Sequence, residues 1–200
     1  MTMKIIHDVE RLSEYWWLVL LRGVFALAFA AVVWVATGVL RLDYGQSIGL
    51  VFIEACFGGY LLVAGLFSIS MAVMVLRDHH WPVTVVHSAL LLALAAWLMY
   101  SDADPIVPLA ALVAVHAVVS GMGEISLARR MRRHQMQGAA LVGAALFSFG
   151  AAVVLVLEMR NVERLIVVTS AYAAVFGAVL IATSFQLRAL RRQAMSAAQA

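Results

Sequence analysis

The chain has 200 residues, and its composition excludes an ordinary water-soluble domain. Apolar residues make up 64% of it and charged residues only 12%, whereas soluble globular domains have about half and about a quarter. This much apolar surface requires lipid as its solvent. The formal net charge of +3 comes from arginines clustered between apolar stretches, which is typical of membrane topology rather than of nucleic-acid binding.

Six apolar stretches predict six transmembrane helices. Each is near or above the roughly 20 residues that a helix needs to cross about 30 Å of hydrocarbon, and a helix satisfies its own backbone hydrogen bonds in lipid. We therefore expect an all-α fold, a polytopic membrane bundle that forms a single integral membrane domain over residues 1–200. The stretches are residues 16–38, 48–76, 82–100, 105–128, 138–157 and 165–187.

Basic residues in the connections predict the orientation. Ten of the fourteen lysines and arginines fall in the amino-terminal segment, the second and fourth loops and the carboxyl-terminal tail, whereas three fall in the other loops. Because cytoplasmic loops carry the excess of basic residues, both termini are expected to be cytoplasmic. The tail, residues 188–200, is expected to be short, and the small, polar part after Arg192 is expected to fray.

The even-numbered stretches share a pattern with a fixed period. Tyr60, His116 and Tyr172 follow one another at intervals of 56 residues, and each precedes a glycine by five residues. A fixed period marks a repeated supersecondary unit, so we expect three two-helix repeats. All three start on the same side of the membrane, so they are parallel, and alternating access built on inverted repeats is not suggested. The glycines are Gly65, Gly121 and Gly177, and the repeats cover about residues 16–76, 81–129 and 138–188.

The odd-numbered stretches align as well. Placing Trp16 over Trp81 puts Arg22 over His87. In the third copy, Val142 takes the arginine position in this alignment.

Three ionisable residues inside the predicted spans form the first candidate site, a buried polar cluster of Arg22, His87 and Glu124. All three lie roughly 8–9 Å from the cytoplasmic boundary at 1.5 Å per residue, so they share one level. Embedded ionisable residues are functional candidates by default. Two structural interpretations are an Arg22–Glu124 ion pair and snorkelling of Arg22 to the interface. The functional interpretation is a proton-responsive or substrate-contacting cluster around His87, because histidine changes charge near physiological pH.

Tyr60, His116 and Tyr172 form a second candidate site, a polar layer near mid-membrane. The structural interpretation is a polar tip that hydrogen-bonds to a neighbouring helix. A proton relay is the alternative.

No motif indicates catalysis, a cofactor or a metal site. The chain lacks HExxH, GxSxG and a glycine-rich nucleotide loop. The single cysteine, Cys56, excludes an internal disulfide and a zinc motif. The adjacent His79 and His80 have no further ligands at suitable spacing. We therefore expect no enzyme, no catalytic residues, no metal and no cofactor.

The repeated segments resemble the HdeD-like family of bacterial acid-resistance membrane proteins. The likeness runs from Trp16 to about Arg188. The resemblance implies a bacterial inner-membrane protein linked to acid stress, and it supplies no established catalytic residues. The segments that carry it are residues 16–23 (WWLVLLRG), Gly59-Tyr60 with Gly65, residues 121–125 (GMGEI) with Arg129-Arg130, and Ala171-Tyr172 with Gly177.

The leading functional expectation is a non-enzymatic integral membrane protein that maintains the envelope or limits acid entry under acid stress. An accessory subunit of a larger membrane complex is the alternative, and a small transporter or channel is the third. The expected partners are the lipid bilayer and either further copies of the chain or a larger membrane complex, with no nucleic acid.

Site-specific labelling tests the predicted orientation. Single cysteines are placed at His79 and at Asp102 in a Cys56→Ala background, and intact cells are treated with a membrane-impermeant maleimide. We expect labelling at position 102 and none at position 79, because the basic imbalance puts the second loop in the cytoplasm. The reverse labelling pattern would contradict the orientation.

Overall fold

All regular structure in the described residues is helical. The structure is a computed structural model, and it describes residues 13–43, 55–56, 58–67, 69–70, 85–86, 88–90, 92–93, 96–97, 106–132 and 139–197. The helices with full bounds are α2 (Trp16–Asp43), α5 (Ile106–Arg132), α6 (Ala139–Leu157) and α7 (Val162–Ala197).

Four helices in the described part of the chain are long and apolar enough to cross a membrane. The expectation of an all-α bundle of the membrane type is confirmed at this level. In the predicted span 48–76, a shorter apolar helix covers Gly58–Phe67. In the predicted span 82–100, only short helical pieces belong to the described residues. The four candidate spans are Trp16–Val35, Ala110–Arg129, Ala139–Leu157 and Glu163–Gln193.

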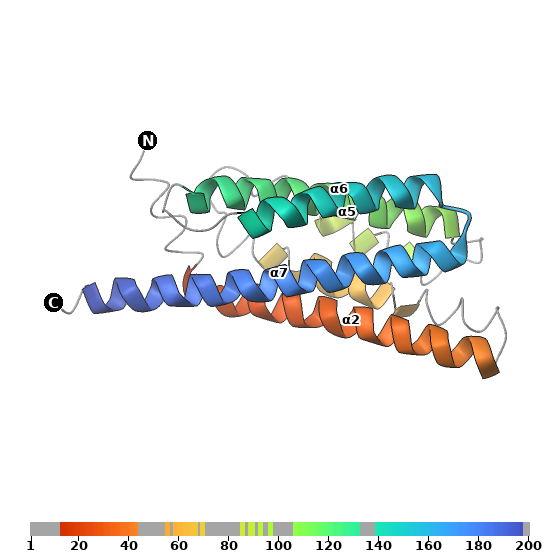
Figure 1. Cartoon of the computed structure of the whole chain (residues 1–200), viewed down its shortest axis with the longest axis horizontal. Coiled ribbons are helices and arrows are strands. Elements are labelled where there is room, and N and C mark those ends of the chain that lie inside the picture. The colour runs from red at the N-terminus through yellow and green to blue at the C-terminus, as the bar shows by residue number, and fades with distance from the viewer. Residues whose placement is uncertain are drawn as a thin grey trace.

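The helices associate in two pairs (Figure 1). The most extensive contacts join α2 to α7 and α5 to α6, while α6 and α7 touch less and α5 barely touches α7. α2 and α6 run in one direction, and α5 and α7 run in the opposite one. The sequence predicts that α6 and α7 form one hairpin. The two helices are indeed consecutive, but the main partner of each is another helix.

A capped turn joins α6 to α7. The backbone N–H of Arg164 donates to Asn161 Oδ1 at 3.2 Å, and the N–H of Leu165 donates to the Asn161 carbonyl at 2.9 Å. An asparagine at this position satisfies amide groups that the first helical turn leaves without partners. The Arg164 side chain also pairs with Glu158 across the turn. These contacts fix a polar boundary at this end of the bundle.

Two glycines allow α2 and α7 to approach each other closely. A Cβ atom at Gly177 would lie 2.7 Å from the carbonyl oxygen of Gly23, and one at Gly23 would lie 2.8 Å from the carbonyl oxygen of Gly177. Real Cβ atoms do not tolerate such distances. Membrane helices use small residues at their interfaces in this way, because van der Waals packing holds them together when lipid removes the hydrophobic driving force.

The other two glycines of the 56-residue pattern also face an odd-numbered stretch. A Cβ atom at Gly121 would lie 3.3 Å from the carbonyl oxygen of Ala145 and 3.2 Å from Phe149. One at Gly65 would lie 3.0 Å from Leu92 and 3.3 Å from the Ser88 carbonyl oxygen.

These contacts correct the alignment of the third odd-numbered stretch. Gly177 faces Gly23 and Leu27, and Gly65 faces Ser88 and Leu92, which are the residues that the Trp16–Trp81 alignment superimposes. In α6 the corresponding residues are Ala145 and Phe149. Ala144, and not Val142, therefore takes the place of Arg22. The reason is that α6 has no polar or aromatic residue at this position, so its register could not be aligned from the sequence.

The carboxyl-terminal tail differs from its expectation. The sequence predicts fraying after Arg192, but α7 continues as a helix to Ala197. The residues in this segment are mainly alanine, glutamine and methionine, which have high helix propensity. Extending a helix that packing has already formed adds one hydrogen bond per residue, whereas nucleating a new one is costly.

Alanine substitutions at two glycines test the close approach of α2 and α7. Gly177→Ala should lower the free energy of unfolding by about 1–3 kcal/mol, because overpacking forces the two backbones apart. Gly143→Ala is the matched control, since a Cβ atom there meets nothing within 4 Å and alanine favours a helix by about 1 kcal/mol over glycine. Thermal unfolding in mild detergent gives both values. Equal behaviour of the two variants would contradict the contact.

Candidate functional site

The three equivalent residues of the 56-residue pattern lie together inside the bundle. The ring centroid of His116 is 6.2 Å from that of Tyr60 and 6.5 Å from that of Tyr172, and both pairs meet edge to face. Only 1% of the surface of His116 and of Tyr172 is exposed, and Tyr60 is partly buried. Edge-to-face contacts of this kind are favourable because the positive ring edge meets the negative ring face. The second candidate site is therefore one contiguous layer of rings.

Two phenylalanines extend this layer at both ends. Phe29 of α2 stacks on Tyr60 with centroids 4.6 Å apart, and Phe176 of α7 stacks on Tyr172 at 5.7 Å. His116 of α5 also meets the Phe176 ring at 6.5 Å. The five rings form an aromatic ladder that connects α2, the short helix Gly58–Phe67, α5 and α7.

Arg22 joins the ladder from α2. Its guanidinium carbon lies 5.1 Å from the centroid of the Phe176 ring, which is a cation–π contact. The Nε atom of Arg22 is buried and has no hydrogen-bond partner in the described part of the chain. Arg22 therefore directs its charge into the bundle, against the ladder, and does not extend wholly to the interface.

Glu124 approaches the same interior from α5. It is 5% exposed, and one carboxylate oxygen accepts a hydrogen bond from Ser148 of α6 at 3.3 Å. Ser148 also donates to the Ala144 carbonyl at 2.9 Å. The other carboxylate oxygen of Glu124 has no hydrogen-bond partner among the described residues. In a bundle this leaves one buried acceptor available to a polar neighbour or a small polar solute.

Arg22 and Glu124 lie within electrostatic reach of each other. They make no direct ion pair with each other, and the ion pair found within the described residues joins Arg164 to Glu158. The structural interpretation of a contact pair is therefore wrong in its direct form. His87, the third member of the predicted cluster, lies outside the described residues, so the cluster is described for two of its three members.

The interior also contains buried hydroxyl groups, and the sequence analysis singled out those of Tyr60 and Tyr172 but not that of Thr169. The hydroxyls of Tyr60, Tyr172 and Thr169 are buried and make no hydrogen bond within the described part of the chain. Ser120 lies beside the Tyr172 hydroxyl, outside hydrogen-bond geometry. Each unsatisfied polar group costs several kcal/mol in a hydrocarbon setting. The described interior therefore contains several buried polar groups whose hydrogen-bonding capacity these residues do not satisfy.

No metal site is visible in the described residues, because no three histidine, cysteine, aspartate or glutamate side chains come together there. The arrangement can position hydrogen bonds and one pair of opposite charges.

Two of the side chains that shape the site were not predicted. Ser148 is one of few polar residues in an apolar stretch, and a search for isolated hydroxyls inside spans would have found it. Phe176 could not be found by comparing repeats, because Ala64 and Ser120 occupy its equivalent places.

Comparisons with known proteins add no relative. No family model, no curated protein and no solved structure matches the chain. The resemblance to the HdeD-like family stays a prediction from the repeated segments.

A double-mutant cycle tests the electrostatic coupling of Arg22 and Glu124. Arg22→Met and Glu124→Gln should each lower the thermal stability in detergent, because each leaves the opposite charge without its counter-charge in the bundle. The double variant should recover part of the loss, with a coupling energy of about 0.5–3 kcal/mol.

Ser148→Ala serves as the control in this cycle. It removes the hydroxyl that contacts Glu124 and the Ala144 carbonyl, leaves both charges in place, and should cost about 1–3 kcal/mol. Combined with Arg22→Met, its effect should be close to additive. Strict additivity of Arg22→Met and Glu124→Gln would show that the two charges do not interact.

Proposed function

We propose that the chain is a non-enzymatic integral membrane protein of the bacterial inner membrane that acts under acid stress, where it helps to maintain the envelope or to limit acid entry. The resemblance of the repeated segments to the HdeD-like family supports this function. The observation that carries it is the meeting of Tyr60, His116 and Tyr172 in one layer. The positions that the repeat marks as equivalent are brought together inside the bundle, which gives the repeated segments a common structural role.

The architecture in this proposal is a bundle of six transmembrane helices built from three parallel two-helix repeats. The glycine contacts support it. Gly65 faces the third stretch, Gly121 faces the fifth and Gly177 faces the first. In each case, the glycine meets two residues of the facing stretch that lie four positions apart. In this arrangement, the helix of each even-numbered stretch packs on the helix of the next odd-numbered stretch. The sixth stretch, α7, completes the ring by packing on the first, α2.

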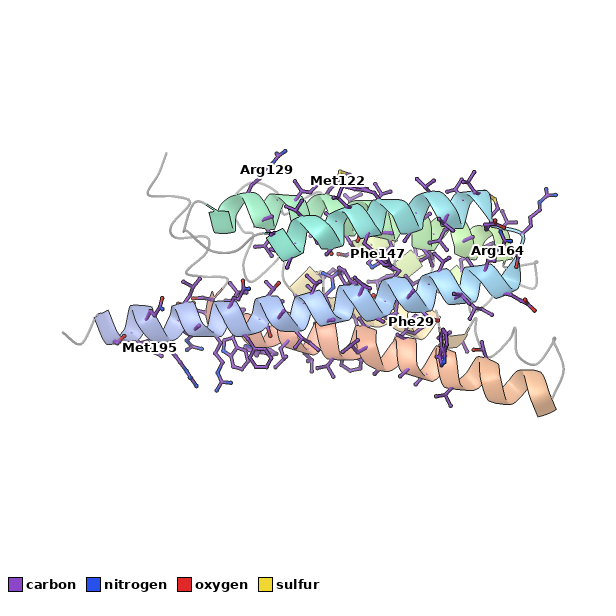
Figure 2. All side chains as sticks on the ribbon, viewed as in Figure 1. Phe29, Met122, Arg129, Phe147, Arg164 and Met195 are labelled. Atoms are coloured by element: carbon purple, nitrogen blue, oxygen red, sulfur yellow. The ribbon has the colours of Figure 1, made fainter. Side chains whose placement is uncertain are left out.

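The proposed orientation places both termini in the cytoplasm. Figure 2 shows Arg129 of α5 and Met195 of α7 toward one end of the bundle and Arg164 at the other. The end of α5 that carries Arg129 and the carboxyl-terminal end of α7 therefore share one end of the bundle, and their basic residues support a cytoplasmic face there under the positive-inside rule.

The second candidate function is an accessory subunit of a larger membrane complex. The helical extension of α7 to Ala197 favours it, because an ordered helix beyond the apolar span offers a partner a rigid surface. Purification in mild detergent with identification of co-purifying proteins separates this candidate from a protein that acts alone.

Survival at low pH tests the proposed function. A clean deletion strain should lose viability at low pH by more than it does at neutral pH, and a plasmid copy of the wild-type gene should restore it. The physical reason is that a bundle that seals or supports the membrane matters most when the proton gradient is steep. Normal survival of the deletion strain in acid would contradict the acid-stress assignment.

Liposomes with a trapped pH dye separate two ways of acting. If the protein limits acid entry or supports the envelope, its liposomes should acidify no faster than empty ones. Faster acidification that Glu124→Gln abolishes would favour the transporter or channel, because that carboxylate is the buried acidic group of the described interior.

A further inference from the structure

The carboxyl-terminal part of α7 has an exposed face of three arginines where its packed segment ends. Leu187 is fully buried, with 0% of its surface exposed. The next residues, Arg188, Arg191 and Arg192, are all exposed. Their spacing of three and four residues places them on one face of the helix. We call this face, Arg188 with Arg191 and Arg192, the arginine face.

One member of the arginine face is tied to the start of α2. The guanidinium carbon of Arg188 lies 4.8 Å from the ring centroid of Trp16, a cation–π contact that limits the freedom of both side chains. Tryptophan at the end of a membrane helix is typical of the interface between hydrocarbon and headgroups. The contact therefore places the arginine face beside an interfacial anchor.

The length of α7 also places the arginine face at the depth of the lipid headgroups. Measured from Glu163 in the first turn, Arg188 lies about 38 Å and Arg192 about 44 Å along the helix axis at 1.5 Å per residue. A bilayer measures about 40–45 Å including both headgroup layers. With the polar turn of Glu158 and Arg164 at one surface, the arginine face falls in the headgroup layer of the other.

No carboxylate among the described residues neutralises the charge on this face. None of the three arginines forms an ion pair with a carboxylate in the described part of the chain, where the nearest acidic residue in sequence to Trp16 is the exposed Glu14. Guanidinium groups bind phosphate through paired hydrogen bonds and are less strongly hydrated than ammonium groups. A phosphate at this depth belongs to a lipid headgroup.

We propose that the arginine face, together with Trp16, is a binding site for the headgroup of an anionic phospholipid. The bound lipid fastens the α2–α7 pair at this end, because Arg188 touches α2 while Arg191 and Arg192 extend the same face of α7. The inference depends on insertion in a membrane and is independent of the acid-stress function.

Thermal unfolding with added lipid tests the site. Purified full-length protein in mild detergent is heated with phosphatidylglycerol or with the same amount of phosphatidylcholine. Phosphatidylglycerol should raise the Tm of the wild type more than phosphatidylcholine does. The variant R191Q/R192Q should lose about half or more of this difference, because each basic residue near an anionic surface contributes to binding, and high salt should weaken the wild-type effect.

A double variant with the same change in net charge is the control. R129Q/R160Q removes two exposed arginines outside the arginine face and should keep the full phosphatidylglycerol effect. Equal loss in both double variants would show a general charge effect and overturn the site. So would an undiminished effect in R191Q/R192Q, or an equal rise in Tm with inorganic phosphate at the same ionic strength.

Discussion

The close approach of α2 and α7 at Gly23 and Gly177 is the contact on which the polar interior depends. Arg22 directly precedes Gly23, and Phe176 directly precedes Gly177. Because the two backbones nearly touch at the glycines, the guanidinium of Arg22 reaches the Phe176 ring at 5.1 Å. A side chain at either glycine would separate the helices and weaken this contact. The close approach of the two backbones therefore also determines where the charge of Arg22 lies.

A second crossing places the carboxylate in the same way. Gly121 of α5 packs on Ala145 of α6. Glu124 and Ser148 each lie within one turn of these residues and share a hydrogen bond. The opposite charges thus enter the interior from two different helix pairs, each positioned by a close contact of small residues. Such residues allow the backbone approach that lipid-embedded helices need for van der Waals packing.

The sequence predicted the features that periodicity marks. The 56-residue spacing singled out Tyr60, His116 and Tyr172, and the structure brings the rings of these three residues into contact. It could not predict the register of α6, because in lipid a helix can be apolar on every face and loses the amphipathic marker of a soluble helix. The sequence also could not predict that Arg22 and Glu124 make no direct ion pair. Equal depth in the membrane does not define the distance between two helices, which depends on which side chains separate them.

Chain connectivity does not decide which helices pack most closely. A short turn makes α6 and α7 neighbours in the chain, but the most extensive contacts join α2 to α7 and α5 to α6. Contacts between α6 and α7 link these two pairs, and α5 adds a smaller contact with α7. In that smaller contact, His116 of α5 meets the rings of Tyr172 and Phe176 of α7. The aromatic ladder therefore supplements the contact between α6 and α7 in holding the two pairs together.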